Sequence, residues 1–149
     1  MGRYFDEFSV GQTFVTPSRT VSEHDITRFA SASGDLNPLH TDKDFSAQTI
    51  HKGLIAHGPM IIGWFFGLVH ELGLFQSTVV GLVSLEWTFL AAVKPGDSLH
   101  ATLEVSELTP SRKGGRGVVE FKLEMVDQMA RCVQRGQCRT MVLASGRKQ

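Results

Sequence analysis

The sequence has few cysteines, no net charge and no long apolar run, and each of these absences argues against a class of protein. Lys and Arg balance Asp and Glu at 15 each, so we expect no basic surface of the kind that binds nucleic acid. The longest apolar run, residues 59–69, is shorter than the roughly 20 residues that cross a bilayer. The first residues lack a basic stretch followed by an apolar one, so we expect a cytoplasmic protein with no membrane partner.

The two cysteines, Cys132 and Cys138, fall on one expected strand. Six residues of strand span about 20 Å, whereas a disulfide requires Cα atoms within about 7 Å of each other. The spacing also differs from the CxxC spacing of metal and redox sites. We therefore predict two free thiols that pack as small buried side chains.

The chain is long enough to bury one core, and its 42% apolar and 20% charged residues are typical of a globular domain. No repeat, low-complexity tract or linker divides it, so residues 1–149 are read as one domain. Gly and polar residues frame a first strand at residues 13–16. A helix is then expected from Ser22, which forms a capping box with Asp25, to Gly34, a residue typical of helix ends.

The stretch SGDLNPLHTD, residues 33–42, is predicted to be a loop, followed by a short helical turn near residues 42–50. A second helix is expected with Pro59 at its first position, because the missing N–H of proline costs nothing there. From Met60 to Leu68 this helix is apolar on nearly every face, which predicts that it is buried all round.

The second half of the chain alternates apolar and polar residues in the manner of strands. These strands are expected at residues 78–89, 98–108, 118–126 and 131–144, with short connections that make the sheet antiparallel. A curved antiparallel sheet wrapped around a long apolar central helix is an α+β, hot-dog architecture. Such a sheet leaves an edge strand exposed, so we expect a homodimer or a dimer of dimers.

The loop gathers an acid and an imidazole, Asp35 and His40, on a segment that Pro38 stiffens. An acid and an imidazole held together can share proton transfers, and Asn37 can orient them through bonds to the backbone. The same composition also suits an ordinary turn, because Asn and Asp favour turns. The residues alone leave both interpretations open.

The stretch SGDLNPLHTDKDFS resembles the signature of the MaoC-like, (R)-specific enoyl-CoA hydratase family, with Ser46 as its final small residue. IAHGPMIIG resembles the segment that opens the family's central helix. The resemblance implies a hydro-lyase that interconverts trans-2-enoyl-CoA and (R)-3-hydroxyacyl-CoA esters. It maps the catalytic residues onto Asp35 and His40, a supporting residue onto Asn37 and the oxyanion-hole N–H onto Gly58. The substrate carries the coenzyme A, so no cofactor and no metal are expected.

This chemistry requires a base, an acid and a donor aimed at the thioester oxygen. Gly58 suits the donor, because it is expected at the N-cap before Pro59, at the positive end of the helix dipole. Close packing is the alternative reason for a glycine there. The chain departs from the pattern at Phe66, where many bacterial members carry a serine that can reach the catalytic acid. Phe66 is therefore expected to line the substrate site and to narrow it for short acyl chains.

Other clusters give weaker hypotheses. One possible metal cluster lacks a familiar ligand spacing; its members are His40, His51, His57, Asp42 and Asp44. The Gly-rich hairpin carries three cations, Arg112, Lys113 and Arg116. They are most simply exposed to solvent, but as an alternative they could bind the phosphates of coenzyme A.

Three other functions remain open. The first is a dehydratase on carrier-protein esters or on branched or dicarboxylic acyl-CoA. The second is a thioesterase, for which Glu71 is the only acid on the central helix. The third is a non-catalytic subunit that binds acyl thioesters.

Overall fold

The computed structural model describes residues 1–146, and local signals set the ends of its first long helix, α1 (Glu23–Ser33). The Ser22 hydroxyl accepts the Asp25 N–H at 3.1 Å, and the Asp25 carboxylate accepts the Ser22 N–H at 2.9 Å. Gly34 ends the helix with a left-handed φ of 79°, a conformation that glycine adopts without strain. The predicted capping box and stop are therefore both confirmed.

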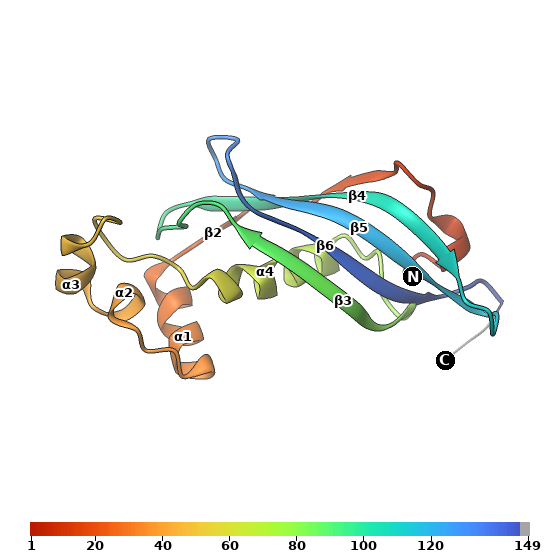
Figure 1. Cartoon of the computed structure of the whole chain (residues 1–149), viewed down its shortest axis with the longest axis horizontal. Helices are drawn as coiled ribbons and strands as arrows, with labels where there is room; N and C mark the ends of the chain where they lie inside the picture. The colour runs from red at the N-terminus through yellow and green to blue at the C-terminus, as the bar shows by residue number, and fades with distance from the viewer. Residues whose placement is uncertain (147–149) are drawn as a thin grey trace.

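A cluster of helices lies at one end of the molecule, and the sheet extends from it toward the other end, where the N-terminus lies (Figure 1). The helices after α1 are α2 (Pro38–Thr41), α3 (Lys43–Gln48) and α4 (Gly58–Glu71), and a short 3-10 helix, η1, spans Phe5–Glu7. The strands are β1 (Thr13–Val15), β2 (Arg19–Thr20), β3 (Val79–Phe89), β4 (Ser98–Pro110), β5 (Arg116–Val126) and β6 (Cys132–Leu143).

The strands form one antiparallel sheet in the order β1-β4-β5-β6-β3, and β2 pairs with β4 beside β1. The prediction of short connections holds for β4–β5 and β5–β6 but is wrong for β3–β4. Residues 90–97 carry the chain past the ends of β5 and β6, because β6 pairs with β3 on one side and β5 on the other. The Leu90 and Ala91 N–H groups donate to the Val133 carbonyl along this crossing.

Helix α4 runs along one face of the sheet and buries one side of itself there (Figure 1). Its buried side chains are Met60, Ile61, Phe65, Leu68 and Val69. They pack on the alternating buried residues of β4 and β5, such as Leu103 and Phe121. The prediction of burial all round is wrong: a single sheet covers only one side, and Gly63 and Gly67 on the other side are exposed.

Both cysteines lie on β6 and are free, as predicted. Burial raises the pKa of the Cys138 thiol to about 11, so this thiol stays protonated at neutral pH. In the described part of the chain, no helix is long and apolar enough to cross a membrane.

Candidate active site

The segment after α1 holds Asp35 by hydrogen bonds at its backbone and its side chain. Its N–H donates to the Ser33 hydroxyl at 3.2 Å, and its carboxylate accepts the Asn37 N–H at 3.2 Å. The side chain is nevertheless exposed. Asp35 is therefore fixed in position while its carboxylate remains accessible to a reactant.

His40 lies in a helical turn, α2, where the sequence predicted only a loop. Pro38 occupies the first turn of α2, and the Asn37 side chain accepts the Leu39 N–H at 3.0 Å as its N-cap. The loop prediction failed because Asn-Pro starts short helices as readily as it forms turns. Asn37 caps the turn that carries His40 and donates its own N–H to Asp35, and its supporting role in catalysis stays a prediction.

The His40 ring is anchored from the segment that precedes α4. Its Nδ1 lies 2.7 Å from the Ile55 carbonyl oxygen. Because a carbonyl can only accept, Nδ1 carries the proton, and Nε2 of the neutral ring is left with a lone pair. His40 can therefore receive a proton at Nε2 while Nδ1 keeps the ring in place.

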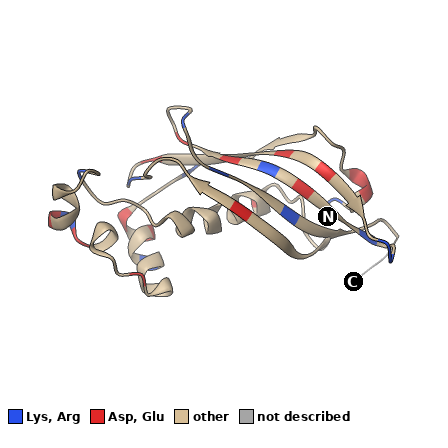
Figure 2. Cartoon of the chain, viewed as in Figure 1, with Lys and Arg blue, Asp and Glu red and all other residues tan. Residues whose placement is uncertain are grey.

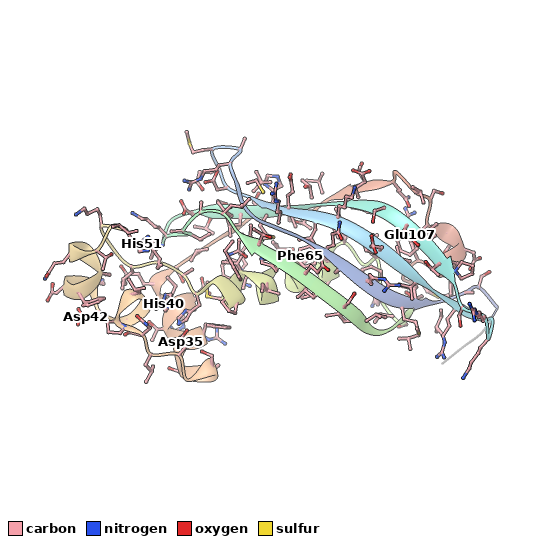
Figure 3. The ribbon with its side chains drawn as sticks, viewed as in Figure 1. Asp35, His40, Asp42, His51, Phe65 and Glu107 are labelled. Atoms are coloured by element: carbon pink, nitrogen blue, oxygen red, sulfur yellow. The ribbon has the colours of Figure 1, made fainter. Side chains whose placement is uncertain are left out.

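His57, two residues after Ile55, contacts both Asp35 and His40. Its Nε2 lies 2.9 Å from the Asp35 carbonyl oxygen, and its ring stacks on His40 with centroids 3.7 Å apart and planes 26° apart. One carboxylate oxygen of Asp35 and one ring nitrogen each of His40 and His57 all lie within 4.8 Å of one another. Asp35 and His40 lie together in the helical cluster at one end of the molecule (Figure 3).

The geometry of the two imidazoles does not suit a shared metal ion. Ligand nitrogens of one ion lie about 2.0–2.1 Å from it, and their lone pairs must converge on it. Rings stacked at 3.7 Å direct their in-plane lone pairs side by side instead. Of the other candidates, Asp42 accepts the Asp44 and Phe45 N–H groups as the N-cap of α3. That the protein needs no metal stays a prediction.

Gly58 is the first residue of α4, and His57 is its N-cap, one residue earlier than predicted. The Gly58 N–H still lies in the first turn, and none of the residues 1–146 accepts it. A Cβ added here would lie 2.6 Å from the Phe89 ring, so close packing also favours glycine. Both interpretations offered by the sequence therefore have a structural basis.

Phe66 lies away from the Asp35–His40 segment. It contacts Phe65 edge-on and lines a cavity of about 230 Å³ together with Val69, Leu103 and Phe121. The cavity is lined by residues of α4, the sheet and the α4–β3 connection and by none of the residues 33–42. Within one chain, Phe66 thus lines this apolar cavity and not the Asp35–His40 segment, and its contact with a substrate stays a prediction.

The cationic hairpin lies far from Asp35 and His40 within one chain. It connects β4 to β5 at the end of the sheet opposite α1–α3, beyond the labelled Glu107 of β4 (Figures 2 and 3). The cations of this hairpin are Arg112, Lys113 and Arg116. A single chain does not support the prediction that they bind the same substrate molecule as Asp35 and His40.

Two residues at this site were missed from the sequence. His57 was considered as part of a metal cluster and of the IAHGPMIIG segment, without a role of its own, and Phe89 only as part of a strand. The position of His57 directly before a Gly-Pro helix start could have marked it. Phe89 reaches Gly58 from a distant strand, so no local signal could have revealed that contact.

The amino-acid sequence also resembles those of known proteins. The family model of the MaoC-like domain matches residues 7–126. This chain belongs to the MaoC-like family. The recognition drawn from residues 33–46 is thereby confirmed. The site residues lie inside the matched region.

Several known proteins resemble the chain along most of its length. An (R)-specific enoyl-CoA hydratase of Rhodospirillum rubrum is 34% identical over 110 residues, which cover 74% of each chain. A 3-hydroxybutyryl-CoA dehydratase of Methylorubrum extorquens is 33% identical, over 76% of this chain and 70% of that one. Protein MaoC of Klebsiella aerogenes is 34% identical over 72% of this chain, but the match spans only 32% of that longer protein.

Solved structures confirm the hot-dog fold. A monoamine oxidase regulatory protein of Archaeoglobus fulgidus superposes with a TM-score of 0.90 at 30% identity, over 97% of this chain and 96% of that one. A Mycobacterium tuberculosis protein with a double hot-dog fold superposes with a TM-score of 0.86 at 24% identity. That match covers 99% of this chain and 46% of that one.

Proposed function

We propose that this protein adds water to trans-2-enoyl-CoA esters to give (R)-3-hydroxyacyl-CoA, or catalyses the reverse dehydration. The observation that carries the proposal is the placement of the Asp35 carboxylate within 4.8 Å of a His40 ring nitrogen. One water oxygen at about 2.8 Å from each group can bridge that separation. The two relatives named for hydration and dehydration support the same reaction.

The reaction needs two proton transfers and no change of oxidation state. The water loses one proton as its oxygen bonds to the β-carbon, and the α-carbon gains one proton. Asp35 and His40 supply the base and the acid between them, because each can accept or release a proton beside the same water. The reaction therefore calls for no cofactor beyond the coenzyme A of the substrate.

The thioester oxygen gains negative charge during the attack, and Gly58 is the proposed donor to it. Its N–H belongs to the first turn of the 14-residue helix α4, where the helix dipole places partial positive charge. A donor already fixed in this orientation stabilises the developing charge without reorganisation.

Two other functions fit the geometry less well. A thioesterase needs an acid near the thioester carbonyl, but Glu71 is the last residue of α4, about 20 Å along the helix from Gly58. A subunit that only binds acyl thioesters needs no water-holding acid and imidazole. Whether the natural ester is coenzyme A or a carrier protein is left to direct comparison of the two substrates.

We expect Asp35→Asn and His40→Ala each to lower kcat for hydration about 100- to 10,000-fold, because each removes one proton-transfer group. The assay follows the loss of enoyl-thioester absorbance and measures free thiol in parallel. Hydration lowers the absorbance without releasing thiol, whereas a thioesterase releases thiol and a binding subunit does neither. His24→Ala, on the exposed surface of α1, is the matched control. Folded variants that keep rates within a few-fold of wild type would contradict the proposed roles.

Gly58→Ala should lower kcat at least about 10-fold, because the added Cβ collides with the Phe89 ring and the first turn of α4 must give way in part, which moves the Gly58 N–H from the oxyanion. The protein should stay folded because the Phe89 ring is 53% exposed and takes up the rest of the displacement. Alanine keeps the N–H, so Gly58→Ala combined with Phe89→Ala should recover most of the activity. If the double variant is as slow as Gly58→Ala, the collision with Phe89 is not the cause.

We further propose that two copies of the chain form a homodimer along β3, which lies at the edge of the sheet. Its exposed apolar side chains include Val80, Leu82 and Val83, and burying them against a second copy removes them from water. The hot-dog pair inside the Mycobacterium tuberculosis relative offers a precedent, because this chain matches 46% of it.

Sedimentation should show wild-type protein at twice the chain mass, and Val83→Lys should shift it toward one chain mass. A lysine on an edge strand opposes pairing because its charge would be buried in the interface between the two copies. Met129→Lys, in the exposed β5–β6 turn, is the control and should leave the dimer intact. A fully active wild-type species of one chain mass would rule out the dimer as the working form.

We propose that Phe66 limits acyl length. The cavity that it lines lies between α4 and β3, because Leu82 of β3 also lines it. Gly58, at the start of α4, faces β3 as well, because it lies against the Phe89 ring. Phe66 is eight residues, or about 12 Å, along α4 from Gly58. An acyl chain that runs between α4 and β3 from Gly58 would meet the Phe66 ring before it fills the cavity.

We expect kcat/KM to fall from four- to eight- to twelve-carbon enoyl-CoA, and Phe66→Ser to reduce that fall. Each methylene in a hydrophobic site is worth about 1–3 kcal/mol, so a blocked path should give a clear trend. Phe45→Ser, which removes an exposed ring from α3, is the control. A wild-type preference for the twelve-carbon substrate, or an unchanged profile in Phe66→Ser, would show that Phe66 is not the barrier.

A further inference from the structure

His57 is a buried imidazole that the proposed reaction does not use as an acid or a base. Only 1% of its surface is exposed, and it contacts both Asp35 and His40. We propose that His57 is a positioning residue that holds these two groups at the separation needed to share one water. Its effect on rate rests on the proposed function, whereas its effect on the geometry can be tested without it.

The hydrogen bonds of His57 show why the position carries an imidazole. The Asp35 carbonyl can only accept, so His57 Nε2 carries the proton and Nδ1 is bare in the neutral ring. Nδ1 is buried and has no partner among residues 1–146. A buried acceptor without a partner is unfavourable, and a phenylalanine of similar shape would avoid it. Packing alone therefore does not account for histidine, whereas the bond from Nε2–H to Asp35 does.

The same short segment holds both reacting groups across long sequence separations. His57 binds the Asp35 carbonyl 22 residues away, and Ile55 binds His40 Nδ1 15 residues away. The His57 ring also stacks on His40 and contacts Phe29 of α1, with centroids 4.9 Å apart. Residues 55–57 lead directly into α4, so they link the Asp35–His40 pair to the helix that presents the Gly58 N–H.

Loss of this support should affect the reaction step more than substrate binding. Asp35 lies outside any helix, and without His57 its carbonyl loses the bond from the 55–57 segment. A displacement of about 1 Å between reacting groups can lower a rate about 100-fold. None of the contacts of His57 involves a group assigned to binding the acyl or coenzyme A part of the substrate, so KM should change little.

Two substitutions separate the ring from the donor. His57→Phe keeps an aromatic ring against His40 and removes the Nε2–H, and His57→Gln keeps an N–H donor near the Nε2 position and removes the ring. We expect His57→Phe to lower kcat about 10- to 100-fold with KM within about 3-fold of wild type. His57→Gln should recover at least about 5-fold in kcat over His57→Phe. His24→Phe, an exposed histidine on α1, should match wild type.

Nitrogen-15 NMR of the histidine rings tests the positioning independently of catalysis. In wild type, His57 should show a protonated Nε2 with a bare Nδ1, and His40 a protonated Nδ1. In His57→Phe, the His40 ring and Asp35 amide signals should both shift, whereas His24→Phe should leave them unchanged.

The outcomes separate the two proposals. Wild-type protein with the expected spectra but no hydration would overturn the proposed function and keep the positioning role. A His57 ring protonated at Nδ1 alone would overturn the positioning role, and so would a folded His57→Phe with wild-type kcat. If His57→Phe does not fold, the wild-type spectra and the kcat of His57→Gln test the positioning role instead.

Discussion

The apolar side of α4 is buried against the sheet, and this packing determines where the helix begins and which groups surround its first turn. Each fully buried side chain such as Phe65 or Leu68 contributes roughly 1.5–3 kcal/mol of hydrophobic stabilisation. Because that face is locked onto the sheet, Gly58 and the three residues before it have fixed positions. Phe89 then reaches Gly58 from β3, so the sheet also shapes the space around the proposed oxyanion donor.

The residues that react in the proposed mechanism belong to a different segment, and residues 55–57 connect that segment to α4. The turn from Ser33 to Thr41 is built locally, by the Asn37 cap and the left-handed Gly34. Its orientation toward the helix is set by three long-range bonds: His40 donates to the Ile55 carbonyl, His57 donates to the Asp35 carbonyl, and the Ile55 N–H donates to the Leu39 carbonyl. Local chemistry therefore shapes the segment, and the packed core decides where it points.

This division explains what could be predicted from the sequence. The capping box at Ser22, the stop at Gly34 and the alternation in β4 and β5 are short-range signals, and all were confirmed. The pairing of β3 with β6 and the one-sided burial of α4 were not predicted, because both depend on which distant strand lies alongside. Asp35 and His40 were candidates from their spacing in one loop, and the family resemblance assigned them the catalytic roles. His57 and Phe89 were missed because their contacts join segments 22 and 31 residues apart.

The phenylalanine at position 66 is consistent with this arrangement. The family resemblance assigns that position a serine in many bacterial members, where its hydroxyl can reach the catalytic acid. In this chain the Asp35 carboxylate accepts the Asn37 N–H, its own N–H donates to Ser33, and its carbonyl accepts from His57. These bonds fix the acid from its own segment and from residue 57, without a hydroxyl on α4. Position 66 is thereby released from supporting the acid and can instead form a wall of the apolar cavity.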